Sequence, residues 1–471
     1  MKNLDAAILA HFSPGFGGTV IPDWLKNWLE KGLGGVTLFS SNCPSLEETA
    51  DLITEIRSYS PTVIISIDEE GGDVTRLFVR EGSPFPTPAM LGKANDLKLT
   101  DGVYFELGKI LRQIGVDLNF APVGDVPVQR DNPIVGVRSF SDDFEIVSNH
   151  LVQAVSGMQR AGVAACIKHF PGHGGVEEDS HHVLPKLKGS LEELEATHLA
   201  PFLRAIDAKA QSVMVGHIIT PALDGDNPAS LSRKVITNYL KSELGFNGIV
   251  VTDALDMGAL GGTKKIANSA LRAISAGADL LCFSGLFDQS LFVENSFALI
   301  KEIAIKDENL AKGIFERSKF LTEWQPPHPE GSSARQPLPI EKIAAGFEIH
   351  GDVKISQPNV QLIELSADPT IAAGFVAWGM RRALTRIGKN VRLESSDSAH
   401  KIDPNSQLVV AFRDAYRDKR ILNILRKIEQ SNPQTIFVDM GWPTYSFAPE
   451  KIIRTFGSSA LASDAAASYM L

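Results

Sequence analysis

The 471-residue chain is poor in cysteine, has no excess of basic residues and contains no long apolar run. Its three cysteines, Cys43, Cys166 and Cys282, form no CxxC pair, which argues against a disulfide scaffold and favours a reducing compartment. The formal net charge of −10 argues against nucleic acid or an anionic membrane as a partner. Because no stretch is apolar enough to cross a bilayer and the first residues show no signal-peptide core, we expect a cytoplasmic protein.

The chain does have the composition of a globular protein, with 44% hydrophobic and 22% charged residues. Its length suits one large domain and a smaller one. The composition changes at residues 325–339, QPPHPEGSSARQPLP, where proline and small polar residues replace apolar periodicity. Such stretches are typical of linkers, so we expect one domain over residues 1–324 and a second over residues 340–471.

Short apolar runs alternate with helical patterns in the first of these parts. Eight such runs occur, at residues 6–11, 35–40, 63–68, 116–122, 163–169, 212–217, 248–253 and 278–283. About eight β-α repeats of this kind predict an α/β fold, a (β/α)8 TIM-like barrel. A doubly wound sheet is the alternative, and the lack of a glycine-rich nucleotide-binding turn makes it less favoured.

The second part repeats the alternation on a smaller scale. Strand-like runs at residues 360–365, 408–413 and 435–440 are separated by helical patterns at residues 371–388 and 417–430. Buried parallel strands read as continuous apolar runs of this type. We therefore expect a smaller α/β sandwich domain with a parallel sheet.

Polar side chains gather at the predicted strand ends of the first part. They are Ser40, Asp68, Asp125, Lys168, His169, His217 and Asp253. In a barrel of this type the carboxyl ends of all strands meet at one face, which is where such enzymes keep their active sites. The pattern therefore predicts an enzyme.

Asp253 ends the predicted seventh strand, in VVTDALDMGAL. A carboxylate fixed by a rigid strand suits a nucleophile that must attack one carbon from one side. The alternative is that Asp253 caps the following helix, a role that fits Asp256 better.

The stretch KHFPGHGGVEEDSHH, residues 168–182, is rich in histidine and glycine. Asp179 lies two residues before His181, so its carboxylate can accept the Nδ1–H of that ring and leave Nε2 to move a proton. The glycines favour a mobile catalytic loop. A metal site built from its histidines and a polar surface loop are the alternatives, but the HExxH spacing is absent. We expect no metal and assign no role to His173 or His182.

Three further groups suit a hydroxyl-rich ligand, each with a simpler alternative. Asp68 lies in IDEEGG, which could be a solvated acidic loop. Arg138 lies in GVRSF, where a surface ion pair is the common role of a lone arginine. His217 in MVGHI could equally be a hydrogen-bonded core histidine.

Together these stretches resemble glycoside hydrolase family 3, and within it the bacterial β-N-acetylglucosaminidase branch in its two-domain form. The matching stretches cover most of residues 60–262, namely IDEEGG, DLNFAPVGDV, GVRSF, KHFPGHGGVEEDSHHVLP, VMVGHIITPALD with PASLS, and LGFNGIVVTDALDMGAL. The resemblance implies a (β/α)8 barrel and a retaining double displacement on β-glycosides. One departure is Asp73, at a position where relatives commonly carry arginine.

The resemblance also implies roles for individual residues. Asp253 matches the nucleophile, and His181 with Asp179 matches the acid/base dyad on a mobile loop. The sugar-binding positions match Asp68, Arg138, Lys168 and His169.

We therefore expect an exo-acting enzyme that removes β-linked N-acetylglucosamine from small carbohydrates such as peptidoglycan fragments, without a cofactor. A phosphorylase or a β-glucosidase on the same scaffold remains an alternative. A metal-dependent hydrolase and a non-catalytic sugar-binding protein are less favoured.

Overall fold

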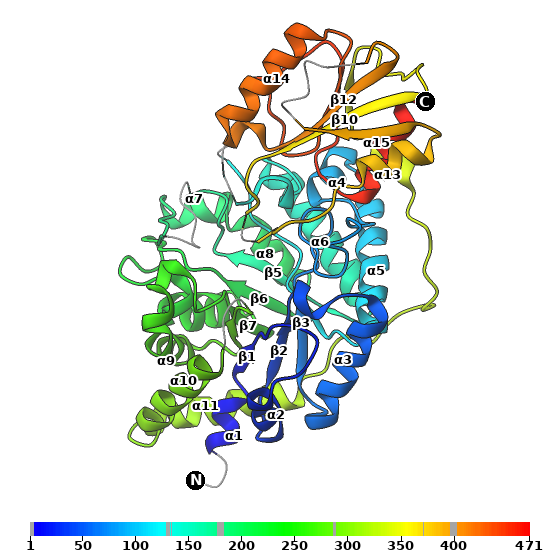
Figure 1. Ribbon diagram of the computed structural model, residues 1–471. Helices are drawn as coiled ribbons and strands as arrows, with labels where there is room; N and C mark the ends of the chain where they lie inside the picture. Colours follow the sequence, from blue (N-terminus) through cyan, green and yellow to red (C-terminus); the bar gives the residue numbers. More distant parts are fainter. Residues whose placement is uncertain are drawn as a thin grey trace. The chain divides into compact units, whose positions relative to one another are not determined.

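A computed structural model describes residues 4–128, 132, 134–176, 183–285, 289–370, 372–395 and 403–471 (Figure 1). The chain forms two compact units. The first unit comprises Met1–Glu69, Thr100–Gln129 and Asp143–Gln336, and the second comprises Glu70–Leu99, Arg130–Asp142 and Pro337–Leu471. Of the helices in the described ranges, none combines the length and apolarity that crossing a membrane requires.

Parallel strands form the centre of the first unit. The six-stranded sheet runs in chain order through β2 (Gly35–Leu38), β3 (Ile64–Ile67), β4 (Leu118–Asn119), β5 (Ala164–Phe170), β6 (Ser212–Val215) and β7 (Ile249–Thr252). β1 (Phe12–Pro14) pairs in parallel with β8 (Leu281–Phe283). The order shows no reversal, which a doubly wound sheet would have. The predicted α/β class with parallel strands is confirmed.

Two contacts connect the strand pair to the six-stranded sheet. The Oγ1 atom of Thr37 on β2 lies 3.0 Å from Oγ of Ser13 on β1. On the other edge, Val251 of β7 forms a parallel bridge with Leu280, the residue before β8. The strands therefore follow one another around a curved surface in the order β1 to β8.

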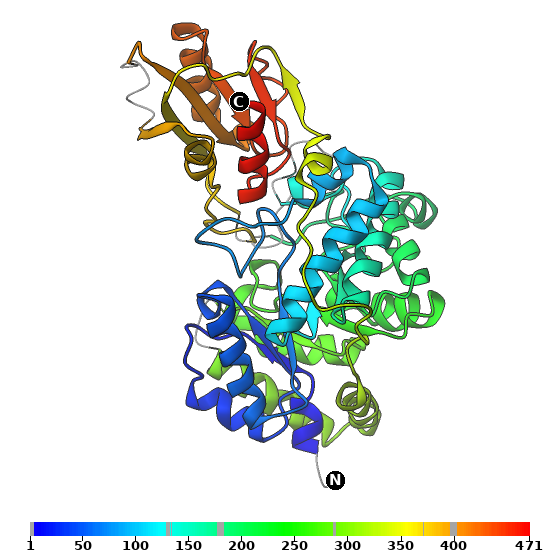
Figure 2. The same cartoon turned by 90° about the vertical axis from the view of Figure 1, so that its right-hand side faces the viewer.

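Helices follow the strands, and most of them lie on the outer side of the curved sheet (Figures 1 and 2). They are α1 (Leu4–Leu9), α2 (Asp23–Glu30), α3 (Leu46–Tyr59), α5 (Leu97–Ile114), α6 (Phe144–Arg160), α7 (Leu191–Ala196), α8 (Ala200–Asp207), η4 (Lys234–Glu243), α9 (Ile266–Ala276), α10 (Ser290–Ala304) and α11 (Glu308–Glu323). Several begin at side-chain caps; the hydroxyl of Ser45, for example, accepts the N–H of Glu48 at the start of α3.

Alternate strand residues fill the inner side of the sheet. The buried cluster there consists of Ile64, Leu118, Phe120, Ala164, Cys166, Met214, Ile249, Val251, Leu280, Cys282 and Leu321. Side chains two positions apart on a strand point to the same face. The strands therefore direct the side chains that follow this cluster, at positions 68, 168 and 253, to the inner side as well.

The prediction of a strand at residues 6–11 is wrong. Residues Leu4–Leu9 form α1, and β1 begins only at Phe12. The run AAILAH is rich in alanine and leucine, which favour helix, and a short apolar run cannot be assigned to strand or helix by periodicity alone. Each of the other seven predicted runs overlaps one of the strands β2 to β8.

The second unit contains a six-stranded sheet of its own. Its order is β11 (Asn390–Glu394), β10 (Asn359–Ser366), β12 (Ser406–Arg413), β13 (Ile436–Asp439), β14 (Ile452–Arg454) and β9 (Glu348–His350). All neighbours are parallel except β9, which pairs antiparallel with β14. Figure 1 shows α14 (Lys419–Ser431) on one side of this sheet, and α13 (Met380–Arg386) and α15 (Ala460–Tyr469) on the other.

One helix prediction in this part fails. The pattern at residues 371–388 suggested a continuous helix, but α13 begins only at Met380 and residues 372–379 form turns and irregular chain. Gly379, directly before α13, has φ of +83°, a conformation that ends or precedes a helix and is favourable only for glycine. Strands β9, β11 and β14 were not predicted, because they are short or interrupted by charged residues.

The proline-rich segment at residues 325–336 is held by hydrogen bonds to the first unit. The N–H of Glu330 donates to the carbonyl of Arg160 at 2.7 Å, and the N–H of Gln336 donates to the carboxylate of Glu106 at 2.8 Å. The Lys109 ammonium donates to the carbonyl of Ala334 at 2.8 Å. These residues therefore follow a defined path along α5 and the end of α6.

Candidate active site

Asp68 and Lys168 form an ion pair at the carboxyl ends of two strands. Lys168 is on β5, Asp68 follows β3, and the distance from Nζ to Oδ1 is 2.6 Å. The Lys168 side chain is only 2% exposed, whereas that of Asp68 is 18% exposed. A buried ammonium needs such a partner, because the desolvation of an unpaired charge costs several kcal/mol. The alternative of a solvated acidic loop is therefore wrong for Asp68.

Asp253 lies directly after β7, on the inner side of the sheet. Its backbone N–H donates to the carbonyl of Val215 on β6, which extends the sheet by one residue. The N–H of Ala254 donates to Oδ1 of Asp253 at 2.8 Å and so orients the carboxylate. The next helical turn begins at Gly258 with Met257 as its N-cap residue, so the alternative role of Asp253 as a helix cap is wrong.

Asp256 is not a helix cap either. Its carboxylate accepts the backbone N–H of Ser284 at 3.0 Å and also binds the hydroxyl of Ser284. Ser284 directly follows β8, so this carboxylate fixes the ends of two adjacent strands to each other. The cap prediction failed because the carboxylate of Asp256 binds Ser284, at the end of the neighbouring strand, and not the N–H groups of a helix.

Asp68, Lys168 and Asp253 lie at the carboxyl ends of β3, β5 and β7 and act on the same buried thiols. Burial raises the pKa of the Cys166 thiol to about 12, Lys168 opposes the rise, and the negative charges of Asp68 and Asp253 add to it. Burial also raises the pKa of Cys282, again with contributions from Asp253 and Asp68.

His169 pairs with a carboxylate that the sequence spacing did not indicate. Its Nδ1 lies 2.6 Å from Oδ2 of Asp125, and the imidazole is 10% exposed. A carboxylate only accepts hydrogen bonds, so Nδ1 carries the proton in this contact. In the neutral ring Nε2 is then the acceptor, which suits a substrate hydroxyl.

Asp125 also holds the beginning of the histidine-rich loop. Its Oδ1 accepts the backbone N–H of His173 at 2.6 Å. A Cβ atom on Gly174 would lie 2.0 Å from the carbonyl oxygen of Val126, so the two backbones are in direct contact there. Burial lowers the pKa of His173 to about 4, which keeps this ring neutral near pH 7. Asp179, His181 and His182 lie outside the described residues.

Arg138 belongs to the second unit and forms a buried ion pair. Its Nε and Nη2 donate to the two oxygens of Glu70 at 2.8 and 2.7 Å. The Arg138 side chain is 7% exposed and that of Glu70 is 1% exposed. The alternative of a surface ion pair is therefore wrong.

Asp73, the departure from the family pattern, is also buried in the second unit. Its Oδ2 accepts from Nη1 of Arg413 at 3.1 Å, and its Oδ1 accepts the N–H of Ser458 at 2.9 Å. A pocket of about 30 Å³ nearby is lined by Asp73, Arg138, Arg413, Asp414, Tyr416 and Arg417, among others. Asp73 thus binds an arginine of the C-terminal segment.

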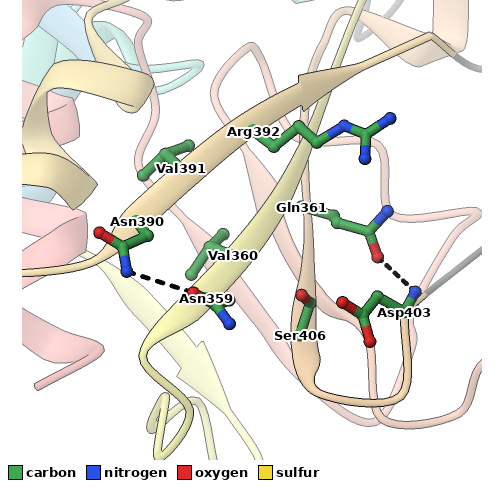
Figure 3. Close-up of a pocket in the computed structure, with 8 residues that line it drawn as sticks. All are labelled: Asn359, Val360, Gln361, Asn390, Val391, Arg392, Asp403 and Ser406. Atoms are coloured by element: carbon green, nitrogen blue, oxygen red, sulfur yellow. Dashed lines mark hydrogen bonds between the residues drawn. The ribbon is translucent and has the colours of Figure 1, made fainter.

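A larger pocket of about 430 Å³ lies against the sheet of the second unit (Figure 3). Its polar side chains bind one another and the backbone. Nδ2 of Asn390 donates to Oδ1 of Asn359 at 3.2 Å, and Oε1 of Gln361 accepts the N–H of Asp403 at 2.8 Å. Of the predicted site residues that the structure describes, none lines it, and its described lining offers no arrangement suited to nucleophilic or acid–base chemistry.

Metal binding is not indicated within the part of the chain that the structure describes. There, no three histidine, cysteine, aspartate or glutamate side chains gather as a metal ion would require. The expectation of a metal-free loop stays a prediction, because residues 177–182 are outside that part.

The structure thus pairs Asp68 with Lys168 and places Asp253 on the same inner side of the first unit's sheet. It also shows two partners that the sequence did not suggest, Asp125 for His169 in the first unit and Glu70 for Arg138 in the second. Asp125 was visible as a polar strand end, but its pairing with His169 was not. Glu70 stood two residues after Asp68 without an assigned role. A site of this kind can hold sugar hydroxyls with charged groups and present one carboxylate, Asp253, from a rigid strand end.

Comparison with known proteins gives a consistent result. The model of the glycosyl hydrolase family 3 N-terminal domain matches residues 17–311. A β-hexosaminidase of Chromobacterium violaceum is 38% identical over 256 residues, which span 53% of this chain and 71% of that protein. A β-hexosaminidase of Stenotrophomonas maltophilia is 36% identical over 288 residues, spanning 59% of this chain and 84% of the relative.

A solved structure extends the similarity to nearly the whole chain. The glycoside hydrolase family 3 β-N-acetylglucosaminidase of Paenibacillus sp. str. FPU-7 superposes with a TM-score of 0.87 at 26% identity. The match covers 99% of this chain and 96% of that one. With the family model covering more than half of its length, the chain belongs to glycosyl hydrolase family 3 and is a glycoside hydrolase.

Proposed function

We propose that this protein is a retaining, exo-acting β-N-acetylglucosaminidase in which Asp253 is the nucleophile. The observation that carries the proposal is the position of Asp253: its carboxylate follows β7 on the inner side of the sheet and is oriented by the N–H of Ala254 at 2.8 Å. A retaining glycosidase needs one carboxylate fixed beneath the anomeric carbon to form a covalent glycosyl-enzyme.

Sugar binding falls to Asp68, Lys168, His169 and Arg138 in this proposal. The pair of Asp68 and Lys168 offers both acceptors and donors for vicinal hydroxyls. The contact of 2.6 Å between Nζ and Oδ1 keeps the two groups in fixed positions. His169 contributes Nε2, since Asp125 engages Nδ1. Arg138 is assigned from the resemblance, and its buried pair with Glu70 supports a fixed orientation.

The acid/base role is proposed for His181, paired with Asp179. A histidine with an ordinary pKa of about 6.5 can protonate the leaving oxygen near neutral pH without tuning by burial. The glycine-rich stretch before it begins at His173, whose backbone N–H donates to Asp125. Asp179 and His181 themselves lie outside the described residues.

The substrate class follows from the relatives. The curated relatives are named β-hexosaminidases, and the structural neighbour is named a β-N-acetylglucosaminidase. We propose cytoplasmic GlcNAc-β-1,4-(anhydro)MurNAc fragments of peptidoglycan as substrates. For the fold, we propose that β1 and β8 complete a (β/α)8 barrel over residues 1–324, with residues 325–339 as linker and a C-terminal α/β domain over residues 340–471.

The test is a panel of p-nitrophenyl β-glycosides assayed on the wild type and on Asp253→Ala. We expect cleavage of the N-acetylglucosaminide and a loss of kcat of about 10⁴-fold or more in the variant. Asp117→Asn is the matched control. Asp117 is a buried carboxylate directly before β4, at the amino end of the strand and not at the carboxyl end where the proposed site lies, and it binds Arg57 at 2.6 Å. The substitution should lower stability and leave kcat intact.

Three outcomes would overturn parts of the proposal. Cleavage of the glucoside without the N-acetylglucosaminide contradicts the substrate class. Wild-type activity in Asp253→Ala contradicts the nucleophile. Release of GlcNAc-1-phosphate in phosphate buffer, with no product in phosphate-free buffer, shows phosphorolysis in place of hydrolysis.

A further inference from the structure

His217 binds the backbone carbonyl of Ala254, the residue whose N–H orients the carboxylate of the proposed nucleophile, Asp253. It follows β6 and is fully buried. Its Nε2 lies 2.9 Å from the carbonyl oxygen of Ala254, and its Nδ1 lies 2.7 Å from Oγ of Ser230. The imidazole thus connects the turn after β7 to the segment that contains Ser230.

The chemistry of these contacts fixes the ring in one form. A backbone carbonyl only accepts hydrogen bonds, so Nε2 carries the proton that reaches Ala254. In the neutral ring Nδ1 is then an acceptor, and the hydroxyl of Ser230 donates to it. Serine can fill this role because its hydrogen rotates freely about the Cβ–Oγ bond.

Ser230 is itself held in place by the backbone. Its N–H donates to the carbonyl of Gly216, the residue before His217, at 3.3 Å. The neighbouring N–H of Ala229 donates to the carbonyl of Ile218 at 2.8 Å. The segment of Ser230 therefore runs beside the end of β6, and the histidine has a supported partner.

Ala254 is consequently held at both of its backbone polar groups. Its N–H donates to Oδ1 of Asp253 at 2.8 Å, and its carbonyl accepts from His217. The following N–H, of Leu255, donates to the carbonyl of Cys282 on β8. The Ala254 carbonyl and the Leu255 N–H belong to one peptide plane, which His217 and the Cys282 carbonyl hold from its two sides. This plane shares the Cα of Ala254 with the plane whose N–H reaches Oδ1, so the hydrogen bond from His217 limits the φ and ψ of Ala254 and, through them, the direction of that N–H.

We propose that His217, supported by Ser230, is a positioning residue that fixes the carboxylate of Asp253 for attack. This inference rests on the proposed role of Asp253 as the nucleophile. His217 acts through Ala254 and does not touch the reacting atoms. Its absence should therefore affect the formation of the glycosyl-enzyme more than the binding of the sugar, which depends on other residues.

The test uses His217→Phe, His217→Gln and Ser230→Ala. Phenylalanine keeps the ring volume and removes the hydrogen bond, whereas glutamine can place a side-chain N–H near the position of Nε2. Because a misplacement of about 1 Å can cost roughly 10²-fold in rate, we expect His217→Phe to lose about that factor in kcat with KM within about threefold of wild type. His217→Gln should recover most of it, and Ser230→Ala should lie between.

His150 supplies the matched control. It is also a fully buried histidine of the first unit, and its Nδ1 lies 2.8 Å from Oγ1 of Thr100, at the interface of α5 and α6. His150→Phe should lower the melting temperature about as much as His217→Phe and leave kcat unchanged. A merely structural role for His217 would instead make kcat follow the melting temperature in both variants.

A covalent label separates this inference from the proposed function. A 5-fluoro glycosyl fluoride of N-acetylglucosamine traps the glycosyl-enzyme, and peptide mass spectrometry locates it. Labelling of a residue other than Asp253 overturns the proposed nucleophile. Labelling of Asp253 at the wild-type rate in His217→Phe overturns the positioning role alone. We expect Asp253 to be labelled in both proteins, and about 10²-fold more slowly in the variant.

Discussion

Asp125 is a fully buried carboxylate that nevertheless stays ionised. Burial raises its pKa, but the His169 imidazole and the N–H of His173 outweigh that effect and leave the pKa below its ordinary value. A carboxylate that accepts several hydrogen bonds is stabilised in its charged form. Asp125 can therefore hold a side chain and a loop backbone at the same time.

Replacing Asp125 by Asn should disturb both partners. In the wild type the two donors bind different oxygens of Asp125. In Asn an NH2 group replaces one of these oxygens, and because it cannot accept, either the His173 N–H or the His169 Nδ1–H loses its acceptor. We expect KM for the N-acetylglucosaminide to rise about 10- to 100-fold, as is common for partners that orient a binding histidine. Nitrogen-15 NMR should show His169 protonated at Nδ1 in the wild type and at Nε2 in the variant. An unchanged tautomer together with an unchanged KM would contradict this role.

Arg138→Lys should lower the free energy of unfolding by about 1–3 kcal/mol, because lysine cannot form the two parallel hydrogen bonds to Glu70. Urea denaturation measures the loss. The control is Arg204→Lys, since Arg204 pairs with Glu145 on the surface and such pairs contribute about 0–1 kcal/mol. Equal effects of the two substitutions would show that burial of the Arg138 pair adds nothing.

The sequence indicated individual site residues at strand ends, but not the residues with which they form hydrogen bonds. Asp68, Lys168 and Asp253 could be assigned to the strand ends because each follows or ends an apolar run, and the carboxyl ends of parallel strands lie at one edge of a sheet. The partner of His169 is 44 residues away, and the carbonyl that His217 binds is 37 residues away. Spacing rules reach only a few positions along the chain, so these contacts depend on strand order and could not be predicted.

Among the elements, strands that are buried on both faces could be predicted from the sequence. A short apolar run, in contrast, could form either a strand or a helix. The runs of β2 to β8 are apolar and β-branched, and their burial agrees with that pattern. The run at α1 has the same length but buries only one side of a helix, through Leu4, Ala7, Ile8 and Leu9. The irregular stretch at residues 372–379 shows the reverse error, an apolar pattern without regular structure.

A substitution at Gly174 tests whether the backbone contact after β5, before the proposed dyad, is needed for stability and activity. A Cβ atom there would lie 2.0 Å from the carbonyl oxygen of Val126, and a backbone clash cannot be relieved by a rotamer change. We expect Gly174→Ala to destabilise the protein by about 1–3 kcal/mol and to lower kcat/KM at least tenfold. Thermal denaturation and steady-state kinetics measure these effects. Gly17→Ala is the control, because a Cβ atom at Gly17 meets nothing within 4 Å; similar losses in both variants would exclude a specific effect on the loop.

For the whole molecule, two buried histidines lower stability in moderate acid, and Asp439, whose pKa burial raises to about 7, opposes them. Burial lowers the pKa of His11 and of His173 to about 4 each. In the unfolded chain both rings take up protons near pH 6.5, whereas the folded protein resists until about pH 4. The unfolded state therefore binds more protons between these values, and stability falls as the pH falls.

We expect each of these histidines to contribute a loss of up to about 1.4 kcal/mol per pH unit between about pH 6.5 and 4. Urea unfolding at pH 7, 6 and 5 measures the slope. His11→Gln should reduce it by the contribution of one proton. Carboxylates with lowered pKa values, such as Asp125, act only below their ordinary range, so they do not account for a loss above pH 5. Asp439 contributes equally to the wild type and to His11→Gln, so the difference between their slopes isolates His11. Equal slopes in the two proteins would contradict the buried, neutral state of His11.

The composition of the second unit limits where the chain can be truncated. It is assembled from three separate stretches of chain, two of which lie within the sequence of the first unit. Thr87 binds the carbonyl of Phe456, and Asp73 binds Arg413 and Ser458, across more than 300 positions. Removing residues 337–471 would strip partners from both inserted stretches. A truncation at residue 337 would therefore also expose the buried side chains of Thr87 and Asp73 that these contacts cover.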